Sequence, residues 1–450
     1  MNGPWITADN LALLTDLYEL TMAQAYWHEQ MQGQAVFSLY FRKLPQRRNY
    51  MLACGLEDVL WYLEQLRFNR AALDYLAGLG LFREEFLRWL EDFRFTGHVY
   101  AMPEGTPIFP EEPLLEVEAP IIQAQLVESY IMNQIHLQTV LASKASRVVH
   151  AARGRPVMDF GLRRMHGSDA AIKSARAFYI AGVEATSNVL GGQVYGLPVA
   201  GTMGHSYIQA HADEAEAFLA FSQLYPDTTL LVDTYDSLRG VECIIELKRS
   251  QGDDFRIKAV RLDSGDLAGL ASRARAILDA AGMEETEIIA SGGLEEYKIA
   301  HLLEYGAPID GFGIGTHMGV SQDAPTLDLA YKLTEYQGEG RLKTSPGKLG
   351  WPGRKQVFRQ QRAGHSIRDI VACHGECQEG RPLLMEVMRD GQRINPQATD
   401  LHLARQRATD EVAALPTSVQ QLDIVEPVYP VEFSARLQEY RNEVLARVQP

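Results

Sequence analysis

The sequence predicts an α/β protein in which residues 156–340 form an irregular barrel of about seven parallel strands. From residue 156 onward, short apolar segments alternate with helical patterns, and each apolar segment ends in a polar or glycine-rich cluster. An open sheet would leave two unpaired edges, so closure into a barrel is expected. The apolar segments are PVMDFG, ATSNVL, LPVAGTMG, TTLLVDTYDS, RIKAVRLDSG, EIIASGG and GFGIGT.

The flanking parts of the chain predict a second, α+β domain. Residues 121–155 form a long amphipathic pattern, which predicts helices that bridge the two domains. Residues 341–450 carry β-like pieces and a final helical pattern, and we expect them to return to the N-terminal domain. That domain, residues 1–120, is predicted to contain a helix in 1–30, a strand at 35–42, helices in 51–95 and short strands in 96–120.

Composition excludes several classes of protein. The 450 residues are 46% hydrophobic and 22% charged, which is typical of a chain with a large folded core. The net charge of −15 argues against general binding to nucleic acids or to anionic membranes. No uncharged apolar run approaches the roughly 18 residues of a membrane span. Four cysteines are too few for a disulfide framework, and the start of the chain does not resemble a signal peptide, so a cytoplasmic location is expected.

Positive charge is concentrated in one segment. Residues 142–176 contain eight Lys and Arg against two Asp, a balance of +6 within an acidic chain. Such an island suggests a site for a small polyanion such as a phosphate ester, and a solvated helix face is the alternative.

Glycine turns at the ends of the last two predicted strands indicate a phosphate site. Ser291, Gly292 and Gly293 follow EIIA, and the segment 313–316, Gly-Ile-Gly-Thr, follows the next strand. Glycine lets backbone N–H groups approach an anion, and parallel barrels bind phosphate at this place. Either turn alone could be purely structural, but the two in succession predict phosphate binding.

Two further strand ends carry candidate chemistry. Arg261 lies two residues before Asp263, so both side chains face the same way, and the arginine could bind a carboxylate through two hydrogen bonds. His205 follows LPVAGTMG and is the candidate nucleophile, because neutral imidazole can attack a phosphoryl group and carry it as a phosphoramidate. A histidine that only makes a loop hydrogen bond is the alternative. Tyr18 and Phe160 also fit core positions, although an aromatic ring beside an arginine could stack on a flat ligand.

Carboxylates at neighbouring strand ends suit Mg²⁺, which prefers oxygen ligands. The candidates are Asp233, Asp236, Asp263 and Asp266, and we assign the metal to Asp263. Helix capping and loop hydrogen bonds are the alternative for each of them. Cys373 and Cys377, in CHGEC, could form half of a zinc site, but no second pair accompanies them.

Seven short motifs occur in order along the chain: LLTDLYELTMAQAYW (within 11–27), FRKLP (41–45), DFGLRRMHG (159–167), GTMGHS (201–206), VRLDSGD (260–266), ASGGL (290–294) and GFGIGT (311–316). Together and in this order they resemble the nicotinate phosphoribosyltransferase family. Gly204 departs from the family pattern, since relatives more often carry alanine before the histidine, and CHGEC has no counterpart in it.

The resemblance implies a type II phosphoribosyltransferase-like barrel that transfers a phosphoribosyl group from phosphoribosyl pyrophosphate to nicotinate, coupled to ATP hydrolysis, in NAD biosynthesis. It implies Mg²⁺ as cofactor, and a homodimer in which the N-terminal part of one chain closes the barrel of its neighbour. By this resemblance His205 is transiently phosphorylated, and nicotinate is bound by Tyr18, Phe160, Thr202 and Arg261. The residues implied for phosphoribosyl pyrophosphate are Arg163, Ser291, Gly292, Gly293, Gly313, Gly315 and Thr316.

Three rival functions stay open. A nicotinamide phosphoribosyltransferase would resemble this chain, but such relatives place an aspartate where Ser187 stands. A non-catalytic sensor of phosphoribosyl pyrophosphate would not need His205, Arg261 and Thr316 together. A barrel aldolase or isomerase would need a strand-end lysine, and Lys258 lies three residues before Arg261, on the opposite face of the strand.

Overall fold

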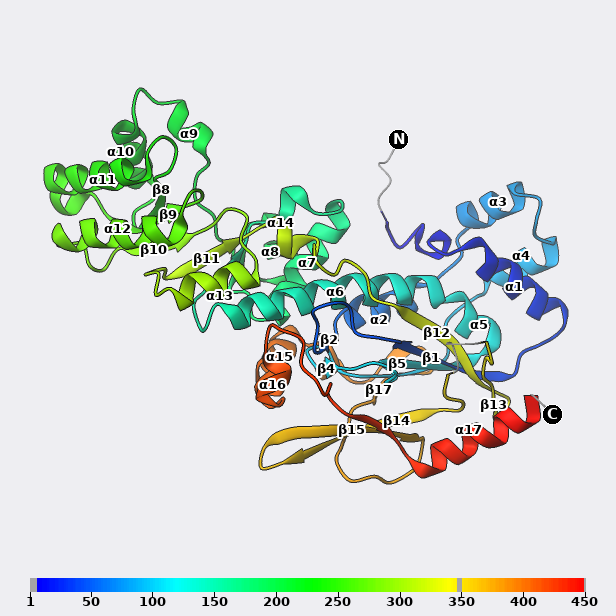
Figure 1. Cartoon of the computed structure of the whole chain (residues 1–450). Helices are drawn as coiled ribbons and strands as arrows, with labels where there is room; N and C mark the ends of the chain where they lie inside the picture. The colour runs from blue at the N-terminus through cyan, green and yellow to red at the C-terminus, as the bar shows by residue number, and fades with distance from the viewer. Residues whose placement is uncertain (1–5, 346–349, 449–450) are drawn as a thin grey trace. The chain divides into compact units, whose positions relative to one another are not determined.

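The computed structural model describes residues 6–345 and 350–448. The chain divides into two compact units (Figure 1). The first consists of residues 1–140 and 326–450, and the second of residues 141–325. Among the described residues, no helix is long and apolar enough to cross a membrane.

The first unit is built on an antiparallel sheet to which both ends of the chain contribute. The strand β1 (Gln34–Phe41) pairs with β5 (Leu115–Pro120) on one side and with β12 (Leu329–Tyr336) on the other. β1 is thus paired along both edges, and it is buried along most of its length. The strand order is β13-β12-β1-β5-β3-β17-β18, with β13 Glu339–Gly340, β3 His98–Ala101, β17 Met385–Arg389 and β18 Gln392–Arg393.

Helices of the N-terminal part pack on this sheet through one continuous core. Phe37 of β1 stacks on Tyr331 of β12 with ring centroids 5.0 Å apart, and Tyr62 stacks on Tyr130 at 4.0 Å. Aromatic pairs of this kind add to the stabilisation from burial alone. The helices are η1 (Leu11–Leu13), α1 (Leu17–His28), α2 (Leu56–Gln65), α3 (Arg70–Gly78), α4 (Glu84–Glu91), α5 (Ile121–Leu126) and α6 (Glu128–Ala151), of which α6 continues into the second unit.

The C-terminal part adds a smaller sheet and three helices to the first unit. In Figure 1 the long hairpin of β14 (Lys355–Arg362) and β15 (His365–Cys373) lies beside the C-terminal helix α17 (Ala435–Val448). The sheet order is β16-β14-β15-β19, and β2 pairs with β4 elsewhere. The remaining elements are β16 (Arg381–Pro382), β19 (Val431–Phe433), β2 (Met51–Leu52), β4 (Pro107–Ile108), η4 (Pro396–Ala398), α15 (Leu401–Ala413) and α16 (Thr417–Gln420).

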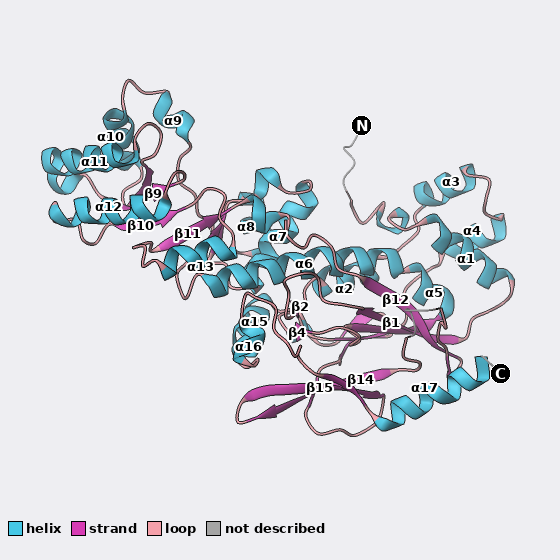
Figure 2. Ribbon diagram, in the orientation of Figure 1, coloured by secondary structure: helices cyan, strands magenta, loops and turns pink. Residues whose placement is uncertain are grey.

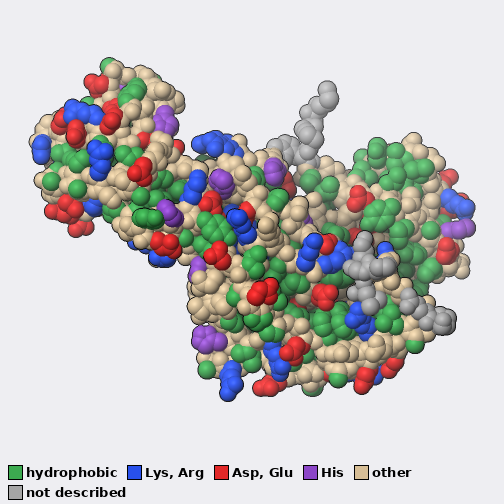
Figure 3. All heavy atoms as spheres, viewed as in Figure 1, with side chains coloured by type: hydrophobic (Ala, Val, Ile, Leu, Met, Phe, Trp, Pro, Cys, Tyr) green, Lys and Arg blue, Asp and Glu red, His purple; other side chains and the backbone are tan. Residues whose placement is uncertain are grey.

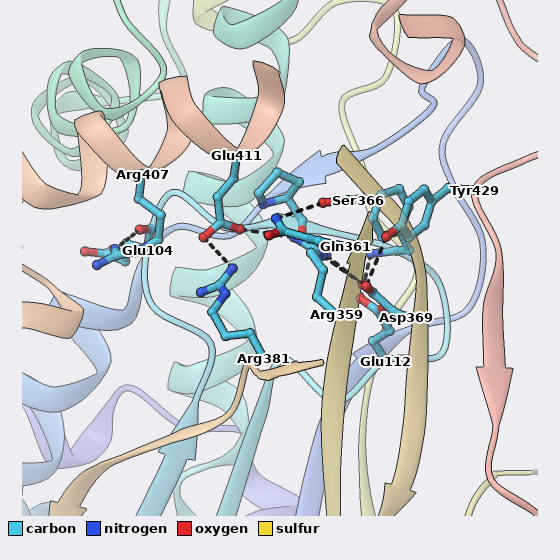
Figure 4. A network of polar contacts seen from close by, with 12 residues as sticks. Glu104, Glu112, Arg359, Gln361, Ser366, Asp369, Arg381, Arg407, Glu411 and Tyr429 are labelled. Atoms are coloured by element: carbon cyan, nitrogen blue, oxygen red, sulfur yellow. Dashed lines mark hydrogen bonds and ion pairs between the residues drawn. The ribbon is translucent and has the colours of Figure 1, made fainter. Parts of the chain in front are cut away.

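A buried ionic network ties this hairpin to its surroundings (Figure 4). Arg359 of β14 is 1% exposed. Its guanidinium lies 2.6 Å from Asp369 of β15 and 3.1 Å from Glu411 of α15, and it donates to the Pro107 carbonyl at 2.8 Å. Tyr429 donates to Asp369 at 3.1 Å. Because a buried charge that loses its partner is strongly destabilising, these contacts fix the hairpin against α15 and β4.

Glu112 brings a second carboxyl group to this network. It is fully buried, accepts a hydrogen bond from the Phe109 N–H at 3.0 Å, and adjoins Asp369. Burial, and then the Asp369 charge, raise the pKa of Glu112 well above its ordinary value. The surroundings of Glu112 therefore favour its neutral, protonated form.

The second unit contains six parallel strands in the order β7-β6-β11-β10-β9-β8, with helices between them (Figure 2). The strands are β6 (Val157–Asp159), β7 (Ala185–Thr186), β8 (Thr228–Leu231), β9 (Ile257–Leu262), β10 (Glu287–Ala290) and β11 (Gly311–Ile314). The helices are η2 (Leu162–Arg164), α7 (Ser168–Ile180), α8 (Val189–Tyr195), α9 (His205–Gln209), α10 (Glu214–Leu224), α11 (Ser237–Gln251), η3 (Gly252–Asp254), α12 (Leu267–Ala280), α13 (Glu296–Glu304) and α14 (Thr316–Gly319).

The α/β fold class with a barrel-like parallel sheet is confirmed, but the described strands form a half-barrel of six, with β7 and β8 at its ends, in place of a closed barrel of about seven. The segment LPVAGTMG contributes a single parallel bridge, between Val199 and Thr186. Pro198 has no N–H to donate to a neighbouring strand, and Gly201 and Gly204 weaken an extended segment, which explains why pairing stops there.

We predict that Glu112→Gln makes the protein less sensitive to alkaline pH. The folded state holds a proton on Glu112 that the unfolded chain releases above its ordinary pKa. The stabilisation is therefore complete below that ordinary pKa and is lost as pH rises toward the raised folded value, by at most about 1.4 kcal/mol per pH unit. Glutamine, which is always neutral, removes this slope.

Urea unfolding between pH 5 and pH 9 measures the effect, with the exposed Glu111→Gln as matched control. The same loss of stability with pH in wild type and Glu112→Gln would contradict the assignment of the proton.

Candidate active site

A cavity of about 700 Å³ opens at the carboxyl ends of the parallel strands of the second unit. This is where parallel α/β sheets bind their ligands. Loops after five of the strands and the bridge segment 201–205 supply its walls, and the strand β9 adds Arg261. The lining residues are Phe160, Arg163, Arg164, Ser187, Gly201, Thr202, Met203, Gly204, His205, Arg261, Asp263, Ser291, Gly292, Gly293, Leu294, Gly313, Gly315, Thr316 and His317.

All but one of the residues assigned to the phosphohistidine, nicotinate, phosphoribosyl pyrophosphate and the metal line this cavity. The exception is Tyr18, which lies on α1 of the first unit and is 47% exposed. Burial and the neighbouring Glu19 and Glu128 carboxyl groups raise the pKa of Tyr18, so its phenol stays neutral.

Sequence reasoning missed several residues of the cavity wall. Two of them carry charge or can do so, namely Arg164 and His317. The sequence could have indicated both residues, because Arg164 is next to the candidate Arg163 and His317 is next to the candidate Thr316.

The glycine turn after β10 is forced by its contact with the loop after β9. Gly292 has φ +86°, and a Cβ atom there would lie 1.7 Å from the Asp263 carbonyl oxygen. Ser291 joins the same loop by donating to Asp263 Oδ1 at 2.5 Å. At the end of β11, a Cβ on Gly313 would lie 2.4 Å from the Phe160 ring. Only glycine allows these close approaches.

Arg261 is held at the floor of the cavity with part of its guanidinium still available. It donates to Thr202 Oγ1 and to the Met203 carbonyl, lies 3.6 Å from Asp263, and stands 5.9 Å from the Phe160 ring centroid. Burial lowers the pKa of Arg261, and Asp263 opposes that effect. Its Nε is buried without a hydrogen-bond partner among the described residues. An anionic ligand would supply that partner.

His205 is the first residue of α9, at the rim of the cavity. Its Nδ1 lies 3.2 Å from Thr234 Oγ1, on the loop after β8. This contact orients the ring and leaves Nε2 without a hydrogen bond to any described residue. A histidine held through one nitrogen can use the other as a nucleophile.

The four aspartates at the strand ends separate into two groups. Asp236 and Asp266 cap the N-termini of α11 and α12, so the capping alternative is correct for both. Asp233 instead accepts hydrogen bonds from Ser264 Oγ at 2.6 Å and from the Asp263 N–H at 3.2 Å. Its Oδ1 is buried without a partner among the described residues.

Asp159 fixes the loop that carries the aromatic and basic side chains of the cavity. It is 1% exposed, accepts from the Gly161 N–H at 2.8 Å, and accepts from Thr186 Oγ1 at 2.7 Å. Burial raises the pKa of Asp159. The loop after β6, with Phe160 and Arg163, is thereby anchored to β7.

The positive island of residues 142–176 is largely paired inside the second unit. Lys144 lies 2.5 Å from Glu296 and 2.7 Å from Asp323, and Arg147 lies 2.9 Å from Glu296. Burial alone would raise the pKa of Glu296, but these cations hold it below its ordinary value. Of the eight Lys and Arg residues of the island, only Arg163 and Arg164 line the cavity. The interpretation of the whole island as a polyanion site is therefore wrong.

The CHGEC segment forms a turn. Glu376 accepts hydrogen bonds from the Cys373 N–H at 3.2 Å and from Ser434 Oγ at 2.8 Å. Over the parts of the chain that the structure describes, three or more His, Cys, Asp or Glu side chains nowhere form a group that could hold a metal.

Fold and cavity together define a class, that of α/β proteins with a ligand cavity at the carboxyl ends of a parallel sheet. Residues 13–136 match the N-terminal domain of nicotinate phosphoribosyltransferase, and residues 156–348 match the nicotinate phosphoribosyltransferase family. The chain belongs to this family.

Individual relatives agree with this assignment. The chain is 56% identical to the nicotinate phosphoribosyltransferase pncB2 of Mycobacterium tuberculosis over 95% of its own length and 92% of that protein. It is 40% identical to the nicotinate phosphoribosyltransferase of Bacillus subtilis, over 82% of this chain and 77% of that one. The crystal structure of human nicotinic acid phosphoribosyltransferase superposes with a TM-score of 0.85 at 26% identity, over 96% of this chain and 99% of that one.

We predict that Gly292→Ala destabilises the second unit far more than Gly293→Ala. Both residues have positive φ, +86° and +59°, so both substitutions carry a conformational cost of about 1–2 kcal/mol. Only at Gly292 does the new Cβ also collide with backbone, whereas at Gly293 the nearest atom is Lys298 Nζ at 3.7 Å. Thermal unfolding of the two variants measures the difference, and equal melting temperatures would contradict the contact between the two loops.

Proposed function

We propose that this nicotinate phosphoribosyltransferase couples phosphoribosyl transfer to ATP hydrolysis through a transient phosphate on His205, as a step of NAD biosynthesis. One observation carries the proposal: a free imidazole nitrogen, a partly satisfied arginine and two glycine turns line the same cavity. The substrates are nicotinate, phosphoribosyl pyrophosphate and ATP.

Nicotinate is a flat aromatic ring with a carboxylate, so it needs a cation and a ring partner. We assign the carboxylate to Arg261, whose Nε lacks a partner among the described residues, with Thr202 beside it. Phe160, whose ring faces the Arg261 guanidinium, is the ring partner within the cavity. Tyr18 is proposed as the second one.

The phosphoribosyl group is assigned to the glycine turns. Gly292 and Gly293 after β10 and Gly315 after β11 would offer backbone N–H groups to the 5′-phosphate, and Thr316 would offer its hydroxyl group. Ser291 and Gly313, the latter within β11, line the cavity beside them and are assigned to the same group. Arg163 makes no ion pair among the described residues that would compete for its charge, and it is assigned to the donor's phosphates.

Two covalent steps follow from these roles. In the first, the Nε2 lone pair of His205 attacks the γ-phosphorus of ATP, the bond to the β-phosphate oxygen breaks and ADP leaves. The proton on Nδ1 stays there, where Thr234 can accept it as a hydrogen bond. Water later hydrolyses the phosphoramidate and returns neutral histidine.

In the second step, the ring nitrogen of nicotinate forms a bond to the anomeric carbon while pyrophosphate leaves with the electron pair of the broken bond. Positive charge develops on the sugar as the leaving group departs, as in glycoside chemistry. Arg163 and the glycine turns hold the donor so that this carbon faces the nicotinate ring.

We propose that Mg²⁺ accompanies the donor and that Asp263 is its protein ligand. Asp263 lines the cavity, and the buried unpartnered Oδ1 of Asp233 lies behind the same loop, so the donor set fits a hard cation. Mg²⁺ keeps several water molecules and binds substrate phosphates, so one carboxylate suffices. When bound, it would stabilise the negative charge of departing pyrophosphate.

A homodimer with shared active sites is proposed as the functional unit. Supporting it, hydrophobic side chains gather on the first unit over α1, α3 and α4 (Figure 3). Leu17 and Tyr18 of α1 and Tyr75 of α3 are exposed. Exposed apolar patches of this kind mark interaction sites.

We further propose a cytoplasmic location, supported by four free thiols. We also propose the division into an N-terminal domain (1–120), bridging helices (121–155), the domain that carries the active site (156–340) and a C-terminal segment that returns to the N-terminal domain (341–450).

Ser187 supports nicotinate over nicotinamide as the substrate. It lines the cavity, and a neutral side chain there does not repel a carboxylate. Turnover with each pyridine, phosphoribosyl pyrophosphate and Mg²⁺, with and without ATP, tests the proposed function. Faster use of nicotinamide, or no effect of ATP, would overturn it.

We predict that His205→Ala folds normally, retains slow transfer and loses its stimulation by ATP. The remaining cavity still binds both substrates, but no nucleophile is left for the γ-phosphate. Incubation with γ-labelled ATP should give an acid-labile label on wild type and none on the variant. His211→Ala, on the loop after α9, is the control that keeps the label. Full ATP stimulation in His205→Ala would show that the nucleophile is wrong.

Arg261→Ala should raise the KM for nicotinate by roughly 100-fold, since a buried charge-assisted hydrogen bond contributes about 1.5–3 kcal/mol. The KM for phosphoribosyl pyrophosphate should change much less. Steady-state kinetics with each substrate varied in turn provide the measurement. An equal rise in both KM values would indicate that Arg261 only supports the structure of the cavity.

A further inference from the structure

His317 is a cavity residue for which the proposed chemistry has no use. It is the second residue of α14, directly after Thr316, and it is partly exposed. It lines the cavity together with residues of the two glycine turns. Within residues 6–345 and 350–448, its imidazole makes no hydrogen bond and no ion pair. A histidine left without a partner beside an anion site has both ring nitrogens available to a ligand.

The neighbours of His317 make this corner of the cavity strongly electropositive. Arg164 of η2 donates to Thr316 Oγ1 at 3.1 Å, which fixes η2 against α14. Arg163 lines the cavity from the same element. Arg164 thus orients the Thr316 hydroxyl, and His317 is the remaining donor on α14 that can turn toward a ligand.

Few acidic groups could compete with a ligand for the His317 side chain. Asp159, behind η2, has its carboxyl oxygens engaged by Gly161 and Thr186. Asp323, on the segment after α14, is paired with Lys144 at 2.7 Å. Asp263, beside the glycine turn after β10, accepts a hydrogen bond from Ser291. The other titratable group of the cavity wall is His205, which contacts Thr234.

We propose that His317 donates a hydrogen bond to the 5′-phosphate of phosphoribosyl pyrophosphate and becomes protonated when that phosphate binds. This inference rests on the assignment of the glycine turns to the donor's 5′-phosphate. A phosphate monoester is mainly a dianion above pH 7, and an imidazole ordinarily titrates near pH 6.5. An adjacent dianion stabilises the imidazolium form, so binding draws a proton from solvent onto the ring.

The consequence is a dependence of donor binding on pH that the backbone N–H groups of the turns cannot produce. Affinity for phosphoribosyl pyrophosphate should fall as pH rises from 6 to 8.5, because imidazolium becomes more costly to form. Nicotinate binding at Arg261 involves no such group and should stay constant over that range.

Calorimetric titration of the full-length protein with phosphoribosyl pyrophosphate, in two buffers of different ionisation enthalpy at pH 7.5, tests the inference. Wild type should take up a fraction of a proton, and His317→Asn should lose most of that uptake. Its KM for the donor should rise about tenfold at pH 7, with the KM for nicotinate unchanged. His301→Asn, an exposed histidine on α13 outside the cavity, is the matched control.

His317→Lys separates binding from a structural role. Lysine keeps a permanent positive charge, so donor affinity should return close to the wild-type value while its dependence on pH between 6 and 8.5 disappears. Proton uptake in His317→Asn equal to that of wild type would overturn the role of His317 and leave the proposed function intact. Absence of any binding to wild type would overturn both.

Discussion

The contact between Gly292 and the backbone of Asp263 is the constraint on which the cavity depends. With a Cβ position only 1.7 Å from a carbonyl oxygen, the loops after β9 and β10 lie in direct backbone contact. Asp263 is thereby brought beside the glycine turn, and Arg261 is two residues away on the same strand. No side chain separates these two loops. The Asp263 carboxylate, the Arg261 guanidinium and the backbone of the glycine turn therefore lie close together.

From that contact a line of hydrogen bonds runs around the rim of the sheet. Ser291 donates to Asp263, Ser264 and the Asp263 N–H donate to Asp233, and Thr234 next to Asp233 holds His205. Each link joins the loop of one strand to a neighbouring loop. The imidazole of His205 is therefore positioned relative to the glycine turns through a series of polar side chains, and such prearrangement suits the proposed chemistry.

Much of the parallel sheet and of the cavity could be predicted from the sequence, because the patterns that indicate them are local. Strand, turn and helix alternate within short windows, and a cluster at the end of a parallel strand must lie at the cavity edge whatever the rest of the fold does. The failures depend on distant partners. Glu296, which pairs with Lys144 and Arg147, lies 152 and 149 residues away from them in the sequence. A count of charges along the chain therefore could not show that these two cations are paired. Pro198 ended a strand that its apolar neighbours suggested. His317 went unnoticed because its importance depends on Arg164, from another loop.

The pairing of β1 with β12 has a consequence for folding during synthesis on the ribosome. Ser38 faces Lys332, and the whole second unit is encoded between these two strands. At ribosomal speeds of about 5–20 residues per second, roughly 15–60 s pass after β1 is made before β12 emerges. During that interval the nascent chain carries an open β edge, which is a template for aggregation. The parallel half-barrel of the second unit can fold during that interval. The first unit, whose translation begins first, is therefore the last to complete its fold.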